Sequence, residues 1–235
     1  MNNDPLISVI TVVLNSVKNI EPTISSVVDQ LNENMEYLVI DGGSTDGTIL
    51  KINKFQKKIS YFISEPDIGI YSAINKAIIK ARGKFIYIIN CGDIMLKIPE
   101  SIINENLHAD LLCFPVILSS GSVFYPKLNS MLRFRNTLPH QGCLYRNIKG
   151  LSFNEKYKVF SDFDLNQKYL KNKKKIIIFQ FPIIASHEID GLSHNSKHSL
   201  EIFKIVRNNY GTLSQLLSFF NFKYLGLLKR LRKFE

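Results

Sequence analysis

The alternation of strands and helices through the first part of the chain is the feature that most constrains its fold. Four apolar runs rich in β-branched residues fit buried strands, at residues 6–14, 37–40, 59–63 and 85–89. Apolar residues at helical spacing separate them, at residues 21–31, 48–57 and 71–81. We expect the last of these helices to end at Gly83, because glycine is common just after helix C-termini. This order predicts a parallel α/β sheet covered by helices.

The pattern is less regular after Pro99. Here we expect strands at residues 111–118, 143–146 and 175–184, and helices at residues 160–170, 200–208 and 213–231. The sequence shows no internal repeat and no linker that divides it. We therefore predict one α/β domain followed by a helical tail.

Polar and glycine-rich turns follow the predicted strands of the first part. The first strand ends at Asn15, the second at Asp41 and the fourth at Asn90, while the third leads into residues 64–71. A single turn of this kind can be purely structural, because Gly and Asp favour turns. Together they lie at the carboxyl edge, where open parallel sheets bind ligands. The sequence contains neither G-x-G-x-x-G nor G-x-x-x-x-G-K-[ST], which argues against nicotinamide and P-loop chemistry.

Five segments of the chain form a recognisable series. They are SVITVVLN (8–15), VIDGGSTDGT (39–48), SEPDIGIYSAINKAIIKARGKFIYIINCGD (64–93), HQG (140–142) and SDFDL (161–165). With these segments the chain resembles the family 2 inverting glycosyltransferases of the GT-A fold, in particular bacterial enzymes that build cell-surface polysaccharides. The resemblance implies a Rossmann-like α/β fold with a mixed, mostly parallel sheet flanked by helices.

The resemblance also implies a division of the chain. A GT-A domain would cover residues 1–195, with a nucleotide-binding half at 1–98 and an acceptor-binding half at 99–195. A basic amphipathic helical tail would follow at residues 196–235.

By this resemblance, the nucleotide and diphosphate of a sugar donor bind at the ends of the N-terminal strands. The residues implied are Val13, Asn15, Asp41, Asp67, Asn90, Cys91 and Gly92. Asp93 matches the last position of the family's D-x-D motif, and its carboxylate would hold the Mn²⁺ or Mg²⁺ ion that bridges the donor phosphates. Cys91 stands where the family has the first aspartate, so this chain has one carboxylate fewer.

The resemblance further implies a catalytic base in the second half. Asp162 matches it, and would take the proton from the acceptor hydroxyl as this oxygen attacks the anomeric carbon in one inverting displacement. An aspartate at a helix start can also serve only to stabilise the helix dipole. The acceptor side would hold His140, Gln141 and Asp164. His187 and residues 191–193 resemble a late loop that closes on the donor diphosphate.

The net charge of +10 is concentrated toward the C-terminus. Residues 196–235 contain eight Lys and Arg but two acidic residues, interleaved with Leu and Phe. Such a helix is typical of segments that lie on an anionic membrane surface, although it can instead pack its apolar face on the core. The sequence has no helix-turn-helix, zinc or RNP signature, and acidic residues gather at the ligand edge. We therefore expect no nucleic-acid partner.

The cysteines favour a reducing compartment, because Cys91, Cys113 and Cys143 form neither a CxxC pair nor a disulfide framework. The sequence opens with no signal-peptide pattern, and its longest apolar stretch falls short of the ~20 residues of a membrane span. We expect a cytoplasmic protein, peripheral on the inner face of the cytoplasmic membrane.

The predicted activity is transfer of a sugar from a nucleotide donor, with UDP-sugar favoured, to a lipid-linked saccharide during synthesis of surface polysaccharide such as O-antigen or capsule. Two alternatives remain open. A sugar-nucleotide nucleotidyltransferase shares this architecture but would carry a basic glycine-rich signature near its N-terminus. A non-catalytic nucleotide-sugar-binding protein is consistent with Cys91 in the metal motif.

Overall fold

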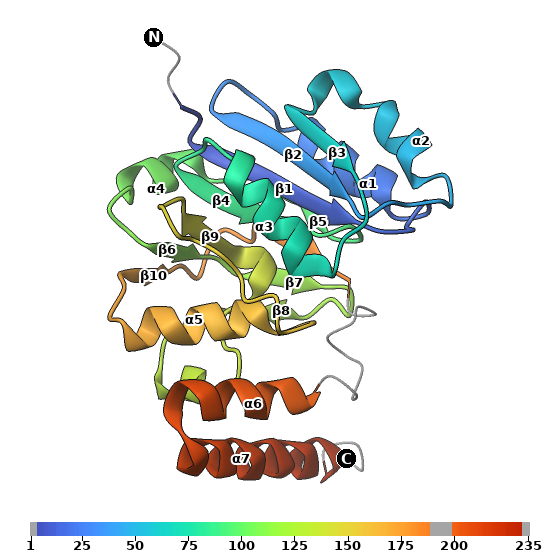
Figure 1. Cartoon of the computed structure of the whole chain (residues 1–235). Helices are drawn as coiled ribbons and strands as arrows, with labels where there is room; N and C mark the ends of the chain where they lie inside the picture. The colour runs from blue at the N-terminus through green and yellow to red at the C-terminus, as the bar shows by residue number, and fades with distance from the viewer. Residues whose placement is uncertain (1–3, 189–198, 232–235) are drawn as a thin grey trace.

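The computed structural model describes residues 4–188 and 199–231 (Figure 1). Within these residues a seven-stranded sheet forms the centre of the molecule. Its strands, in sheet order, are β10 (Ile176–Ile178), β6 (Leu111–Cys113), β9 (Cys143–Arg146), β4 (Phe85–Ile88), β1 (Ile7–Val13), β2 (Met35–Asp41) and β3 (Tyr61–Ser64). Neighbouring strands are parallel except that β9 runs antiparallel to both β4 and β6. The predicted mixed, mostly parallel sheet is therefore confirmed.

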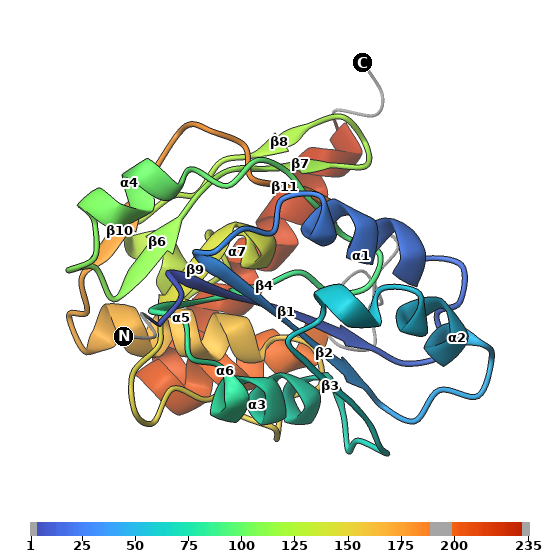
Figure 2. The ribbon, with the colours of Figure 1, turned by 90° about the horizontal axis from the view of Figure 1, so that it is seen from above.

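Helices cover both faces of this sheet (Figure 2). One face carries α1 (Ile20–Val28), α2 (Thr48–Asn53) and α4 (Glu100–Glu105), and the other carries α3 (Ile70–Lys80) and α5 (Ser161–Lys171). Successive side chains of a strand point to opposite faces. Accordingly Ile10 and Val12 of β1 pack with α3 and α5, while Val9 and Val13 pack with α1. This burial on both faces explains why β1, β2 and β4 are mostly apolar, with buried polar residues such as Glu36 and Asp41 bonded within the protein.

A second, smaller sheet adjoins the carboxyl edge of the first. In the described part of the chain it has four strands, β5 (Ile94–Met95), β11 (Ala185–His187), β7 (Val116–Leu118) and β8 (Val123–Phe124). Two predictions were wrong here. Residues 111–118 are not one strand, because the chain passes from the first sheet to the second at Phe114 and Pro115. Residues 175–184 form a strand only at β10, after which the chain is irregular up to β11.

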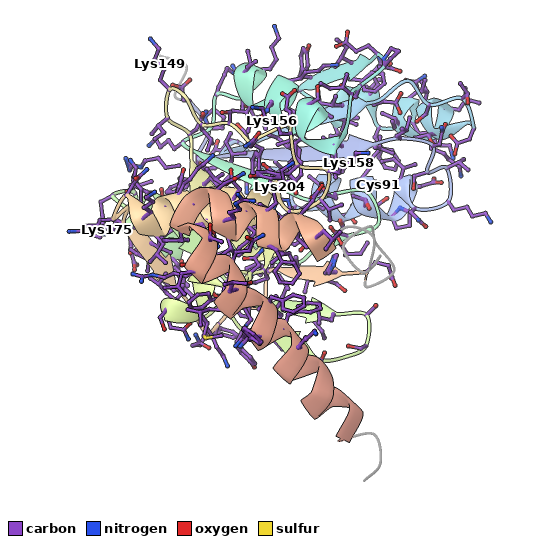
Figure 3. All side chains as sticks on the ribbon, turned by 60° about the horizontal axis from the view of Figure 1, so that its bottom comes forward. Cys91, Lys149, Lys156, Lys158, Lys175 and Lys204 are labelled. Atoms are coloured by element: carbon purple, nitrogen blue, oxygen red, sulfur yellow. The ribbon has the colours of Figure 1, made fainter. Side chains whose placement is uncertain are left out.

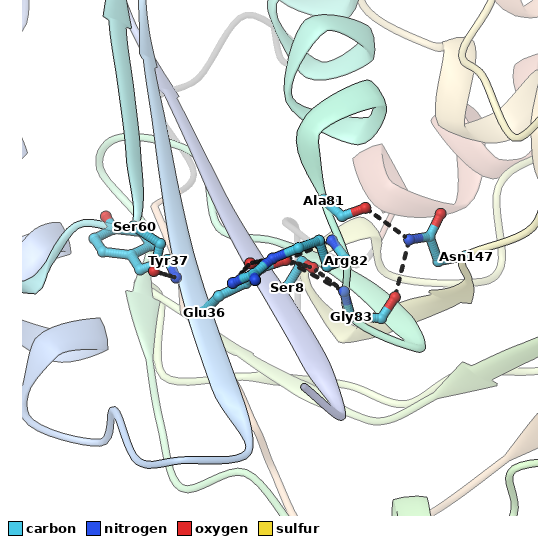
Figure 4. A network of polar contacts seen from close by, with 8 residues as sticks. All are labelled: Ser8, Glu36, Tyr37, Ser60, Ala81, Arg82, Gly83 and Asn147. Atoms are coloured by element: carbon cyan, nitrogen blue, oxygen red, sulfur yellow. Dashed lines mark hydrogen bonds and ion pairs between the residues drawn. The ribbon is translucent and has the colours of Figure 1, made fainter. Parts of the chain in front are cut away.

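Gly83 does not cap α3, which corrects the sequence-based prediction. The helix ends at Lys80 and Ala81 is already extended. A Cβ atom at Gly83 would lie 2.3 Å from the backbone nitrogen of Ser8, so glycine is required here by close approach. The carboxylate of Glu36 accepts hydrogen bonds from the backbone N–H groups of Arg82 (2.6 Å) and Gly83 (3.2 Å), as Figure 4 shows.

Two helices close the described chain, α6 (Ser199–Tyr210) and α7 (Thr212–Leu231). Both match the helices predicted from the sequence. Figure 1 shows α6 between α5 and α7. Ile205 and Val206 of α6 are buried in the core, so this helix is packed on the α/β domain. The predicted domain boundary at residue 195 and the late loop at residues 191–193 lie outside the described residues.

Candidate active site

A cleft of about 610 Å³ opens at the carboxyl ends of β1 and β4. This volume is in the usual range for small-ligand sites. Its lining comes from the end of β1, the segment leading into α3, the turn after β4, and the segment before α5. These contribute, among others, Val13, Asp67, Tyr71, Asn90, Cys91, Tyr157, Lys158 and Val159. Of the predicted donor-binding residues, Val13, Asp67, Asn90 and Cys91 are thus brought together.

Asp41 and Asn15 organise the glycine-rich loop that follows β2. Asp41 is fully buried, and its Oδ2 accepts hydrogen bonds from the backbone N–H of Ser44 (2.8 Å) and the hydroxyl of Ser64 (2.6 Å). Asn15 Oδ1 accepts from the N–H of Thr45 (2.9 Å). The other oxygen of Asp41, Oδ1, has no hydrogen-bond partner among residues 4–188 and 199–231. A buried oxygen without a partner is costly in an apoprotein, and a donor group of a ligand would satisfy it.

Asp67 lies on the cleft wall just before α3. Its Oδ1 is 2.5 Å from Nζ of Lys76, which also pairs with Glu65 at 2.7 Å. The hydrogen bonds to Asp67 and Glu65 raise the pKa of Lys76. Within the described residues the buried Asp67 Oδ2 has no hydrogen-bond partner, so this oxygen at the cleft wall has unused capacity to accept a hydrogen bond.

Asp93 is held by residues from the second half of the chain. Its Oδ1 lies 2.7 Å from Nδ1 of His187, and its Oδ2 accepts a hydrogen bond from Nε2 of Gln141 at 2.9 Å. His187 reaches Asp93 because β11 pairs with β5, the strand that follows Asp93. Gln141, predicted on the acceptor side, is thus bonded to Asp93 and His187.

Asp93 and His187 are side chains of the types that hold divalent cations. Their Oδ1 and Nδ1 atoms are bonded to each other at 2.7 Å, so an ion held by both would replace this hydrogen bond and complete its coordination with substrate phosphates and water. In the described part of the chain no group of three His, Cys, Asp or Glu side chains is placed to hold a metal. Burial raises the pKa of the Cys91 thiol, which lies two residues before Asp93.

Asp162 lies in the first turn of α5 and is buried. Its Oδ2 accepts a hydrogen bond from Nδ2 of Asn136 (2.8 Å), and its Oδ1 is 3.4 Å from the hydroxyl of Tyr71, a residue of the cleft wall. Burial raises the pKa of Asp162. Burial also lowers the pKa of His140, and a positive charge on His140 would lower the pKa of Asp162. A carboxylate with a raised pKa beside a cleft is a candidate general base.

Asp164 points elsewhere. Residues two apart in an α-helix point about 200° apart, so Asp164 and Asp162 lie on different faces of α5. The carboxylate of Asp164 pairs with Lys168 (2.6 Å) and accepts from Nδ2 of Asn209 in α6 (2.9 Å). It joins α5 to α6, which does not support the predicted acceptor-side role. Sequence reasoning missed Tyr71 and Asn136, because neither side chain forms a motif with Asp162 along the chain.

Comparison with known proteins finds similarity to glycosyltransferases. Residues 8–97 match the model of the family described as Glycosyl transferase family 2. The chain is 27% identical over 209 residues to a "PGL/p-HBAD biosynthesis glycosyltransferase" of Mycobacterium bovis (strain BCG / Pasteur 1173P2), covering 81% of this chain and 80% of the relative. These matches support a family 2 glycosyltransferase.

Two solved structures show the same fold. TarS 1-349 of S. aureus, in complex with UDP-GlcNAc, has a TM-score of 0.68 and 19% identity, and the alignment covers 86% of this chain but 66% of TarS 1-349. Glucosyl-3-phosphoglycerate synthase of Mycobacterium tuberculosis, in complex with Mn²⁺, UDP and glucosyl-3-phosphoglycerate, has a TM-score of 0.63 and 16% identity over 89% of this chain and 81% of that chain. The mixed, mostly parallel sheet flanked by helices therefore matches GT-A glycosyltransferase structures.

Proposed function

We propose that this chain is an inverting, metal-dependent glycosyltransferase that moves a sugar from a UDP-sugar to a hydroxyl group of a lipid-linked saccharide. The observation that carries the proposal is that two acidic groups, Asp93 and Asp162, each contact a residue that lines one cleft, namely Asn90 and Tyr71. Asp93 is paired with His187 in the turn after β4, and Asp162 is buried against Tyr71 of the cleft wall. Glycosyl transfer needs both an anion-neutralising centre for the departing diphosphate and a base for the acceptor.

The donor would lie at the carboxyl ends of β1 and β4. Val13 supplies an apolar side chain to the cleft wall, and Gly42 supplies backbone. The Oδ2 atom of Asp67, which has no partner among the described residues, would accept a hydrogen bond from the base or ribose. Similar structures hold UDP-GlcNAc or UDP, and a mannosyltransferase of Pyrobaculum calidifontis holds GDP-Man and Mn²⁺. A nucleoside diphosphate sugar is the ligand class that these features share.

Asp93 and His187 would hold the Mn²⁺ or Mg²⁺ ion. When bound, such an ion stabilises the negative charge of the departing diphosphate. Gln141 fixes the geometry of the pair, because its amide lies 2.9 Å from both Asp93 Oδ2 and His187 Nδ1. The base is Asp162: its carboxylate accepts the proton of the acceptor hydroxyl, and one in-line displacement inverts the anomeric centre.

The acceptor would be lipid-linked, and the enzyme would work at the inner face of the cytoplasmic membrane in synthesis of surface polysaccharide. Residues 149–235 contain 16 of the 30 Lys and Arg but 7 of the 20 Asp and Glu. Figure 3 shows Lys204 on α6 and, above it in this view, Lys156 and Lys158 of the segment before α5. Apolar residues of α7 such as Leu213, Phe220 and Phe222 are more than half exposed. Among the described helices, none has the length and apolar character of a membrane span.

A turnover assay with a panel of UDP- and GDP-sugars tests the activity. We expect release of UDP that EDTA abolishes and Mn²⁺ or Mg²⁺ restores. Asp93→Asn should remove turnover, whereas Asp110→Asn, a carboxylate paired with Lys174 at the far edge of the sheet, should not. Binding without turnover would indicate a non-catalytic nucleotide-sugar-binding protein. Formation of a nucleotide sugar from UTP and a sugar phosphate would indicate a nucleotidyltransferase, and turnover indifferent to EDTA would contradict the metal.

Co-sedimentation with lipid vesicles tests whether α7 binds a membrane surface. Phe220→Ser in α7 should reduce co-sedimentation with anionic phosphatidylglycerol vesicles, because it removes apolar area from the binding face. Leu50→Ser, at an equally exposed leucine of α2, is the matched control. Equal loss in both variants, or in neither, would contradict a surface formed by α7.

A further inference from the structure

Glu201, on helix α6, binds the chain just before the helix that carries Asp162. Its Oε1 accepts a hydrogen bond from the backbone N–H of Lys158 (2.8 Å), and its Oε2 accepts from those of Val159 (3.0 Å) and Phe160 (3.3 Å). Helix α5 begins at the next residue, Ser161. Glutamates within a helix often satisfy backbone donors at their own helix start, as in a capping box. Here Glu201, which is on another helix and more than forty residues later in the chain, accepts the hydrogen bonds of the backbone N–H groups just before α5.

The segment that Glu201 holds forms part of the cleft wall. Lys158 and Val159 line the cleft directly. The carbonyl oxygen of Val159 accepts a hydrogen bond from the hydroxyl of Tyr71, and this same hydroxyl contacts Asp162. One short segment therefore links the carboxylate of Glu201 to the cleft wall and to the candidate base.

Other contacts fix α6 and α7 to the surroundings of Asp162. Asn208 donates a hydrogen bond to the hydroxyl of Tyr157 (2.9 Å), another residue of the cleft wall. In α7, the hydroxyl of Ser218 donates to the carbonyl of Phe134 (2.7 Å), two residues before Asn136. The C-terminal helices thus contact both segments that hold Asp162 in place.

We propose that Glu201 is a positioning residue for sugar transfer, which makes α6 part of the catalytic unit rather than only a link to a membrane-binding helix. The proposal rests on the proposed function. By holding residues 158–160, Glu201 fixes the cleft wall, the start of α5 and, through them, the orientation of Asp162. Replacing the carboxylate with an amide leaves one acceptor oxygen and turns an NH2 group toward the other backbone N–H groups, which lets the segment move.

The test compares two buried or half-buried carboxylates that each accept backbone N–H groups. Glu201→Gln is the variant, and Glu36→Gln is the matched control, because Glu36 binds Arg82 and Gly83 at the amino end of β2, the opposite end of the sheet from the cleft (Figure 4). We expect Glu201→Gln to lower kcat about 10- to 100-fold, the range that small misplacements of catalytic groups produce. The KM for the donor should change less than about 3-fold, because Val13, Asp67 and Asn90 are untouched.

Glu36→Gln should lower Tm without lowering kcat at temperatures where it is folded. Glu201→Asp, which keeps the charge on a shorter side chain, should recover part of the kcat lost in Glu201→Gln, and it answers the same question if Glu201→Gln does not fold. Amide hydrogen exchange at residues 158–160 should accelerate in both Glu201 variants.

Unchanged kcat in Glu201→Gln beside an active wild type would overturn this proposal alone. A loss of kcat matched by Glu36→Gln would also overturn it, since the role would then be one of general stability. A wild type that turns over no nucleotide sugar would overturn the proposed function and this inference with it.

Discussion

The two halves of the chain place their polar groups by different physical means. In residues 4–98, Asp41 ends the strand β2, and Asp67 and Asn90 lie in the segments that follow β3 and β4, so the sheet itself brings them together. In residues 99–231, Asp162 is held by side chains and backbone from separate elements, including Asn136 and the segment bound by Glu201. The first half is organised by local turns, and the second by long-range packing.

This difference predicts whether a variant should change binding of the donor or the rate of transfer. A change at Asp41, Asp67 or Asn90 should affect binding of the donor, since each lies at or after the end of its own strand; Asp93 is the exception, because Gln141 and His187 of the second half hold it. A change in the second half should affect the rate of transfer, because Asp162 depends on contacts that converge from several elements. The following variants test that division.

The largest effect is expected at Asp162. Asp162→Asn removes the base but keeps the shape of the side chain and a hydrogen-bonding oxygen. General-base catalysis contributes about 100- to 10,000-fold, so kcat should fall within this range while Tm stays close to that of the wild type. Asp164→Asn is the control on the same helix; it breaks the pair with Lys168 and should lower Tm but keep most of kcat. Similar kcat losses in both variants would contradict the assignment of Asp162.

The same division explains how much could be predicted from the sequence. The strands of the first half and the turns after them were predictable, because apolar runs and turn residues are local signals. The roles of Asn136 and Glu201 were not, since nothing near either residue in the sequence points to Asp162. His187 was noticed only within a late loop, because β5 and β11 are too short to show strand periodicity. The prediction that Gly83 caps α3 was wrong for a related reason, because Ser8, which approaches Gly83 in space, is far from it in the sequence.

Two glycines offer a comparison of the halves at the level of stability. A Cβ at Gly83 would lie 2.3 Å from Ser8 N, and one at Gly142 would lie 2.1 Å from Phe114 O. Each Gly→Ala change should cost about 1–3 kcal/mol of unfolding free energy by overpacking, measured by urea denaturation. Only Gly142→Ala should also reduce kcat, because the adjacent Gln141 bonds Asp93. A reduced kcat in folded Gly83→Ala would contradict the proposed difference between the two halves of the chain.

A moderate effect is expected at Asp67. Asp67→Asn keeps the size of the side chain but removes its charge and its pair with Lys76. Loss of a hydrogen bond to a charged group costs about 1.5–3 kcal/mol, so the KM for the donor should rise about 10-fold or more with kcat little changed. Glu65→Gln, which also pairs with Lys76 but lies outside the cleft lining, is the control. A fall in kcat with unchanged KM would place Asp67 in the transfer step instead.

The smallest expected effect is a shift in the pH profile. Asp162 must be deprotonated to act as a base, and burial raises its pKa, so kcat should fall on the acidic side at a higher pH than an ordinary aspartate would give. The hydrogen bond from Asn136 favours the carboxylate and opposes this rise, as does the charge of a protonated His140. Tyr71 and Tyr145 also face Asp162, and both remain neutral because burial raises their pKa values.

Asn136→Leu therefore should raise the pKa of Asp162 further and move the acidic limb of the kcat profile to higher pH, with kcat recovering on the alkaline side. Asn75→Leu is the matched control, since its amide donates to the carbonyl of Phe153 and to Glu155. It removes a half-buried amide whose partner Glu155 lines the same cleft, and it should leave the limb in place. A pH-independent loss of kcat in Asn136→Leu would mean that Asn136 acts on the position of Asp162 alone. An unchanged profile would mean that the acidic limb of kcat reports the titration of a group other than Asp162. The contacts from separate elements of the second half would then not determine the pKa that limits kcat.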